Sequence, residues 1–138
     1  MPYLCVMNVT TKTSTLTKRE FESLNNRLIR SCEAFMGKKK GINVKLRNRG
    51  KSYRGLYDYE TKTIYLYINN LPLVSDYIKV FIHEYAHSRQ RGLKTKYGAY
   101  NILYGYKNNP YEIDANTKMN DLYPVVKTMV KKMSLYES

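Results

Sequence analysis

The two histidines of this chain, His83 and His87, stand four residues apart in the segment VFIHEYAHSRQRG. Residues four apart on an α-helix project from the same face, where two imidazoles can bind one metal ion. Glu84 lies about 100° further around such a helix, so its carboxylate can flank the ion and accept a proton from a nearby water. This H-E-x-x-H spacing on a predicted helix is typical of a zinc site, with His83 and His87 as ligands and Glu84 as general base.

A catalytic zinc site has three protein ligands and one open position, so the third ligand must come from elsewhere in the chain. No other histidine is present, and four acidic residues follow the motif: Glu112, Asp114, Asp121 and Glu137. In the segment NNPYEIDANTKMND, Glu112 shares a helical face with Asn116, whereas Asp114 points in another direction. Glu112 is also the third residue after a helix cap at Asn109, where a glutamate can serve as a capping residue alone. The residues themselves therefore leave the third ligand open.

An H-E-x-x-H motif followed on a later helix by E-x-x-A-N resembles the gluzincin metallopeptidases. The pattern is similar to that of the very small gluzincin-like peptidases of phages and other mobile elements, whose second motif reads E-x-x-A-[ND], and the match covers residues 53–121. This resemblance implies that Glu112 is the third zinc ligand, with Asp114 in reserve, and that the chain is encoded by a phage or another mobile element. It also implies that Asn116 orients a ligating histidine. Larger gluzincins carry Asp at that position, so this chain offers the imidazole a neutral partner.

The resemblance further implies a zinc-dependent metallopeptidase that hydrolyses peptide bonds of a polypeptide substrate. Bound Zn2+ would lower the pKa of its water toward roughly 7 and polarise the scissile carbonyl, and Glu84 would pass the proton to the leaving amine. A second donor must stabilise the oxyanion that forms. Four tyrosines are candidates for this donor, and the sequence does not choose among them: Tyr97, Tyr100, Tyr104 and Tyr106.

The helix that carries the histidines is predicted to start at Ser75 or Asp76, to run to Arg91 and to stop at Gly92. Apolar and aromatic residues recur on one side of it at helical spacing, which predicts that this side faces the core. These residues are Ile78, Phe81, Ile82 and Tyr85.

Helices are also predicted before and after the histidine helix. In LTKREFESLNNRLIRSCEAFMG, Thr17 and Glu20 can form a capping box, and Gly37 ends the apolar stripe. A later helix opens with Pro110 in its first turn, where proline is well tolerated. Pro124 is expected to kink this helix or to divide it into two pieces.

Alternation of apolar and polar residues predicts a small sheet between the first helix and the histidine helix. INVKLRN alternates as a half-buried strand does, and SYRGLYDYETKTIYLYINN is typical of a hairpin with its turn at residues 58–61. TIYLYIN, residues 63–69, is expected to form the rim of the cleft, where a zincin strand can pair with an extended substrate; the alternative is a plain interior strand. Together the elements predict one zincin-like α+β domain over residues 1–138, with an N-terminal helix, a small antiparallel sheet, the H-E-x-x-H helix and a C-terminal helix or helices.

The chain carries a formal net charge of +13, and eight of its 24 lysines and arginines fall between Lys38 and Arg54, where no acidic residue interrupts them. Such a run either attracts an acidic partner, nucleic acid included, or forms a solvated basic face. A second hypothesis is therefore a nucleic-acid-binding module with a structural H-E-x-x-H helix, although the sequence shows no helix-turn-helix signature and no stacking platform. A third is a zinc amidase that acts on a non-protein amide, because the same activated water serves both reactions.

Several classes of protein are disfavoured by what the sequence lacks. No apolar run approaches the roughly 20 residues that span a bilayer, and the first residues lack the basic leader and apolar run of a signal peptide. Two cysteines, Cys5 and Cys32, form neither a C-x-x-C pair nor a disulfide framework. These features predict a cytoplasmic protein, and none of them indicates an oligomeric state.

Overall fold

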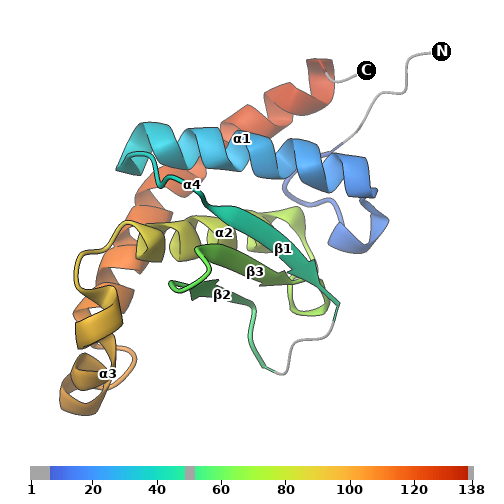
Figure 1. Ribbon diagram of the computed structural model, residues 1–138. Helices are drawn as coiled ribbons and strands as arrows, with labels where there is room; N and C mark the ends of the chain where they lie inside the picture. The colour runs from blue at the N-terminus through green and yellow to red at the C-terminus, as the bar shows by residue number, and fades with distance from the viewer. Residues whose placement is uncertain (1–6, 49–51, 137–138) are drawn as a thin grey trace.

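A computed structural model describes residues 7–48 and 52–136 of the chain (Figure 1). Within these residues it contains four α-helices, a mixed three-stranded sheet and two short 3₁₀-helices, at Thr13–Thr15 and Ile68–Asn70. The predicted α+β class is therefore confirmed. Cys5 and Glu137 lie outside the described residues, as do Arg49 and Lys51 of the basic run. None of the helices in the described ranges combines the length and hydrophobicity that a membrane crossing requires.

The first long helix, α1 (Lys18–Met36), begins and ends where its capping residues predicted. The Glu20 N–H donates to Thr17 Oγ1 at 3.1 Å and the Thr17 N–H donates to Glu20 Oε1 at 2.9 Å, which completes the capping box. The helix ends at Gly37, whose φ of 93° is rarely adopted by residues with a side chain. A stripe of buried residues attaches α1 to the core: Phe21, Leu24, Leu28 and Cys32.

The sheet consists of β1 (Asn43–Arg47), β2 (Gly55–Asp58) and β3 (Thr63–Tyr67) in the spatial order β1-β3-β2. β2 and β3 form the predicted antiparallel hairpin, whereas β1 runs parallel to β3. The prediction of an antiparallel sheet was therefore wrong, and the sheet is mixed. After β1 the chain passes to the far edge of the sheet at β2 and then returns between the two strands as β3. The central strand β3 contributes Ile64 and Leu66, both fully buried, to the core.

The central position of β3 also shows that the prediction of residues 63–69 as the rim strand was wrong. Hydrogen bonds to β1 and β2 occupy both edges of β3, so no peptide can pair with it. Among the described strands, β1 and β2 each keep one unpaired edge. A peptide that extends this sheet must therefore add to β1 or to β2.

The helix α2 (Val74–Ser88) carries both histidines. It starts at Val74, one residue before the predicted Ser75, and Asp76 in its first turn accepts a hydrogen bond from the Leu73 N–H at 3.0 Å. It ends at Ser88, earlier than the predicted end at Arg91. All four residues of the predicted core face are fully buried: Ile78, Phe81, Ile82 and Tyr85.

A further helix, α3 (Leu93–Tyr104), was not predicted from the sequence. Gly92, at φ 73°, is the left-handed residue between α2 and α3. Leu93 is the only buried residue of α3, so this helix lacks the apolar stripe that usually reveals a surface helix in a sequence. α3 projects from the rest of the molecule at the end away from both termini (Figure 1).

The last helix, α4 (Pro110–Tyr136), starts after the predicted cap at Asn109, whose side-chain oxygen accepts a backbone N–H of the first turn at 3.0 Å. The helix continues through Pro124, so the predicted division into two pieces does not occur. Leu122 and Val126 are buried on either side of Pro124. Their packing against the core keeps the helix in one piece where the proline ring removes a hydrogen bond.

Candidate metal centre

His83 and His87 occupy successive turns of α2 and direct the same ring nitrogen toward each other. Their Nε2 atoms lie 3.2 Å apart, and the two rings meet edge to face. His87 is 6% exposed and the His83 side chain 14%. The Tyr85 hydroxyl donates to the Gly37 carbonyl at 2.8 Å and so ties this part of α2 to the end of α1. The histidines therefore stand on a helix that is fixed on its inner side.

Glu112 joins the histidines from the first turn of α4. Its Oε1 lies 2.7 Å from His83 Nε2 and 3.2 Å from His87 Nε2, and its Oε2 accepts a hydrogen bond from the Tyr97 hydroxyl. Glu112 is 3% exposed. The Asn109 N–H, which a capping-box glutamate would accept, instead donates to the Tyr106 carbonyl at 3.3 Å. The carboxylate of Glu112 is thus directed into the histidine pair and does not cap the helix.

The geometry of these three side chains fits a metal ion. One donor atom from each of His83, His87 and Glu112 lies within 4.8 Å of the others. Tetrahedral ligands at the zinc distances of 2.0–2.1 Å are about 3.4 Å apart, so the observed separations of 2.7 to 3.2 Å need to widen only slightly. Two imidazole nitrogens and one carboxylate oxygen form a donor set that suits Zn2+.

Glu84 lies beside this cluster as a buried carboxylate of its own, 9% exposed. Burial raises the pKa of Glu84, and it outweighs the two histidines and a hydrogen bond from the Tyr57 backbone N–H, which favour the charged form. Tyr57 belongs to β2, so this hydrogen bond connects the Glu84 carboxylate to the edge strand. A raised pKa makes a carboxylate a stronger base, which suits a group that takes up a proton during a reaction and releases it later.

The two acidic groups differ in the direction of their pKa shifts. Burial would raise the pKa of Glu112, but the hydrogen bonds from His83 and His87 outweigh it and hold that pKa well below its usual range. Burial would lower the pKa of His87, but its hydrogen bond to Glu112 and the nearby charge of Glu84 raise it. Glu112 therefore stays ionised as a ligand must, while Glu84 is the carboxylate that can exchange a proton.

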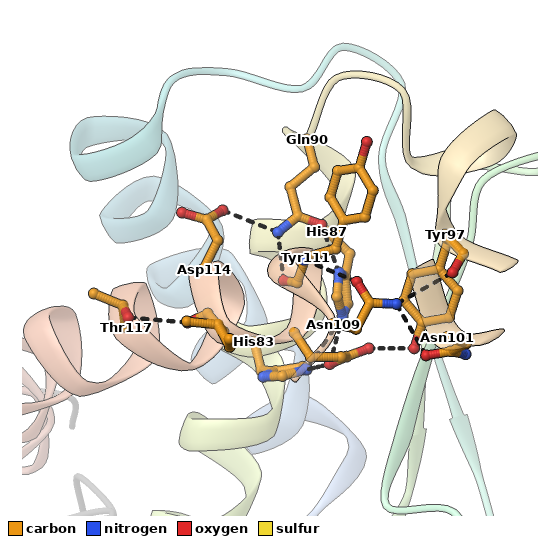
Figure 2. A network of polar contacts seen from close by, with 11 residues as sticks. His83, His87, Gln90, Tyr97, Asn101, Asn109, Tyr111, Asp114 and Thr117 are labelled. Carbon is orange, nitrogen blue, oxygen red and sulfur yellow. Dashed lines mark hydrogen bonds and ion pairs between the residues drawn. The ribbon is translucent and has the colours of Figure 1, made fainter. Parts of the chain in front are cut away.

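Gln90 holds His87 through its other ring nitrogen, Nδ1 (Figure 2). Its Oε1 lies 2.7 Å from His87 Nδ1, while its amide nitrogen donates to the Tyr111 carbonyl at 2.8 Å and to Asp114 Oδ2 at 2.9 Å. Because the amide nitrogen already has two acceptors, the oxygen must face the ring, and Nδ1 carries the proton. Asp114 is itself paired with Lys118 at 2.8 Å.

This network separates Asp114 and Asn116 from the histidine cluster. Asp114, the reserve ligand of the sequence analysis, does not belong to the cluster and reaches His87 only through Gln90. Asn116 is exposed, and within the described residues no hydrogen bond joins it to His83 or His87. Gln90 was not predicted as part of the site, although it is the only glutamine of the chain and follows His87 by three residues. Residues three apart on a helix are neighbours, so this spacing on the predicted helix was the available signal.

A pocket of about 510 Å³ opens above Glu84 and the three clustered side chains. Its walls come from β2 and the hairpin on one side and from α3 and the following turn on the other. The wall residues are Tyr53, Gly55, Leu56, Tyr57, Tyr59, Leu93, Lys94, Tyr97, Gly98 and Tyr106. The catalytic candidates thus lie at the bottom of a pocket that is rich in tyrosine.

The pocket narrows the choice among the four tyrosines. Tyr97 and Tyr106 line it, whereas Tyr100 and Tyr104 do not and pack against each other with ring centroids 5.9 Å apart. The Tyr97 hydroxyl is already engaged by Glu112. Partial burial, the charges of Glu112 and Glu84 and a hydrogen bond to Glu112 raise the pKa of Tyr106 to about 12, so its hydroxyl keeps its proton at neutral pH.

Comparison with known proteins adds no relative from which a function could be transferred. The chain matches no protein-family model, and no curated protein and no solved structure is significantly similar to it. Any functional conclusion therefore depends on the residues and geometry of the site itself.

Proposed function

We propose that the chain is a zinc-dependent metallopeptidase in which His83, His87 and Glu112 are the zinc ligands. The observation that carries this proposal is the convergence of two Nε2 atoms and one carboxylate oxygen beside the separate buried carboxylate of Glu84. The Gln90 oxygen accepts from the His87 Nδ1–H, so Nε2 is the ring nitrogen that faces the Glu112 carboxylate, 3.2 Å away. Without a metal, a proton on this Nε2 makes the hydrogen bond to the carboxylate and raises the pKa of His87. A zinc ion at this position would take the place of that proton.

Zinc in this site would supply a Lewis acid for the scissile carbonyl and lower the pKa of a coordinated water. Glu84 accepts the proton of the attacking water, since its raised pKa brings it closer to the pH of the reaction. The same carboxyl group then donates that proton to the leaving amine. The Tyr57 N–H holds the carboxylate in place during both transfers.

The developing oxyanion needs a hydrogen-bond donor besides the metal. Tyr106 supplies it, because its hydroxyl is protonated, lines the pocket and lies close enough to Glu112 and Glu84 to be influenced by their charges. Tyr97 has a different role, which is to hold Glu112 Oε2 so that Oε1 faces the histidines.

The substrate would be an extended polypeptide that adds to β2. This strand has an unpaired edge and contributes Gly55, Leu56 and Tyr57 to the pocket wall. Its direct link to Glu84 would place a peptide paired with β2 beside the general base.

A peptide-cleavage assay with mass-spectrometric detection tests this function. We expect the zinc-loaded protein to cleave members of a peptide library, to lose activity with a chelator and to regain it with added zinc. Glu84→Gln should retain one zinc per chain and lose about 10²–10⁴-fold in rate, since it removes the general base. Tyr106→Phe should lower the rate by roughly a hundredfold with intact zinc binding. Glu60→Gln, at the exposed hairpin turn, is the matched control and should cleave as the wild type does.

Two outcomes would contradict the proposal. Undiminished turnover in Glu84→Gln would show that Glu84 is not the general base, which is the central assignment of the proposal. Zinc-dependent hydrolysis of a non-protein amide, together with no cleavage of any peptide, would replace the peptidase by an amidase that uses the same residues.

A further inference from the structure

The face of the sheet that is turned away from α2 carries basic and aromatic side chains in rows. In one row across the sheet, Lys45 of β1 lies beside Tyr65 of β3, and Tyr65 lies beside Leu56 of β2. The next row pairs Arg47 with Tyr67. Each row therefore begins with a basic residue at one edge of the sheet and continues to a tyrosine at its centre. We call these five side chains the outer face of the sheet.

The outer face is accessible in the described structure. Lys45, Arg47 and Leu56 are exposed, and both tyrosines are half-buried. The opposite face of β3 is covered, since Ile64 and Leu66 are fully buried and α2 packs against β2 and β3. In the view of Figure 1, α2 runs behind the strands and no helix lies in front of them.

Each aromatic ring of the outer face already contacts either a cation or another aromatic ring. The Arg47 guanidinium lies 5.1 Å from the centre of the Tyr65 ring, and the Tyr67 ring lies 6.2 Å from that of Tyr53. A guanidinium beside a tyrosine ring forms a surface on which a flat, electron-rich group can stack. The basic run is visible in the sequence but the stacking platform is not, because Tyr65 and Tyr67 lie outside that run and only strand pairing brings them to it.

Further charges surround the outer face with mostly positive sign. Lys38 and Lys40 precede β1 and Lys62 precedes β3, and all three are exposed. Arg54 is neutralised by Asp76 at 3.2 Å. Asp58 ends β2 two residues after Leu56 and projects from the same side of the sheet, and Glu60 lies in the hairpin turn. The positive charge is therefore concentrated near β1, and the acidic residues at the hairpin end of β2 reduce it at the opposite edge of the sheet.

We propose that the outer face of the sheet binds single-stranded nucleic acid. Lys45 and Arg47 meet the phosphates, and bases stack on Tyr65 and Tyr67, which is the combination that binds single strands without sequence preference. A single strand is favoured over a duplex because only unpaired bases expose the flat surfaces that tyrosine rings can stack on. It is favoured over an acidic polypeptide because carboxylates would use the basic residues and leave the tyrosines without a role. The site lies outside the metal cluster, so this inference does not depend on the proposed peptidase activity.

Fluorescence anisotropy with a labelled oligothymidylate, measured over a series of salt concentrations, tests the inference on the zinc-loaded chain. Lys45→Ala with Arg47→Ala should weaken binding at least about tenfold at low salt and reduce the salt slope by roughly 1.4, or about 0.7 for each lost phosphate contact. Tyr65→Leu with Tyr67→Leu keeps the charge and most of the buried area. It should weaken binding roughly fivefold or more without changing the slope.

The matched control is Arg27→Ala with Arg30→Ala, which removes the same charge from the exposed side of α1. This variant should bind almost as the wild type does, and circular dichroism of all three double variants should show the same folded spectrum. The inference is overturned if the α1 variant loses as much affinity as the β1 variant, because binding would then reflect net charge alone. It is also overturned if the tyrosine variant binds normally and polyglutamate competes as well as an oligonucleotide of equal charge.

Discussion

The side chain of Gln90 determines which nitrogen of His87 is available to a metal. Its Oε1 lies 2.7 Å from His87 Nδ1 and accepts the proton of that nitrogen, so that Nε2 is the nitrogen that faces Glu112. Asp114 and the Tyr111 carbonyl hold the Gln90 amide in that orientation. Partners of this kind orient a ligating imidazole before the metal arrives and so reduce the cost of ordering the site.

We expect Gln90→Ala to weaken zinc binding about 10–100-fold, because the His87 ring loses the acceptor that sets its tautomer and orientation. Competition with a chromophoric chelator at constant pH measures this affinity. Gln90→Glu keeps an acceptor toward Nδ1 and should recover part of the loss. Asn116→Ala is the control, since that residue is exposed and should leave the affinity unchanged. If Asn116→Ala bound zinc weakly and Gln90→Ala bound it with normal affinity, the role of orienting the histidine would belong to Asn116.

The parts of the site that could be predicted from sequence are those set by local spacing. His83, Glu84 and His87 are related by helical geometry alone, whereas Glu112 was singled out only by the resemblance to the gluzincin pattern, because the residues themselves left the third ligand open. Gln90 was missed, although residues three apart on a helix are neighbours and its spacing from His87 pointed to a contact. Tyr106 could not be chosen over the other tyrosines, because only the turn between α3 and α4 brings it into the pocket.

At the scale of the elements, β2 and α2 approach each other closely at Gly55. A Cβ built on Gly55 would lie 2.4 Å from Val80 Cγ1 and 3.2 Å from Glu84 Cγ. Glycine is therefore required here for close contact between strand and helix, and not for an unusual backbone angle. This contact lets the Tyr57 N–H reach the Glu84 carboxylate.

We expect Gly55→Ala to destabilise the fold by roughly 1–3 kcal/mol, because the branched Val80 side chain cannot move aside without strain. Urea denaturation measures the change. Gly55→Ala with Val80→Ala should recover part of the stability by removing the clash. Gly98→Ala on α3 is the matched control: no atom lies within 4 Å of its added Cβ, and removal of a helical glycine should stabilise by about 0.5–1 kcal/mol. Equal destabilisation by both single variants would show that the contact at Gly55 has no special role.

The elements that the sequence predicted well are those with local end signals. The capping box of Thr17 and Glu20 and the cap at Asn109 define the starts of α1 and α4. The direction of β1 and the central place of β3 depend on how the three strands pair with one another, and that is a property of the whole sheet. α3 escaped prediction because it buries only Leu93.

At the scale of the whole molecule, Cys32 reports on global stability from a position distant in sequence from the histidines. It is fully buried on α1, and burial together with the charge of Glu33 raises the pKa of its thiol far above the usual range. The thiol should therefore react only when the chain unfolds. A ligand that binds only the folded chain at 100 times its Kd stabilises it by about 2.7 kcal/mol, which is roughly a hundredfold in the unfolded population.

We expect alkylation of Cys32, followed by mass spectrometry in a Cys5→Ser background, to slow by roughly a hundredfold when zinc is present at 100 times its Kd. His87→Ala is the control, in which zinc should have little effect on the rate because a ligand is missing. If zinc binds but leaves the wild-type rate unchanged, local opening of α1 exposes Cys32 and the metal does not stabilise the fold as a whole.

The most direct test of the metal centre is anomalous diffraction at the zinc absorption edge from crystals of the zinc-loaded protein. We predict one strong peak per chain, within about 2.0–2.2 Å of His83 Nε2, His87 Nε2 and a carboxylate oxygen of Glu112. Widening of the three donor separations toward about 3.4 Å should accompany the bound ion. The account is contradicted if the peak lies on other residues, such as Asp114, or if zinc-loaded crystals show no peak at this cluster.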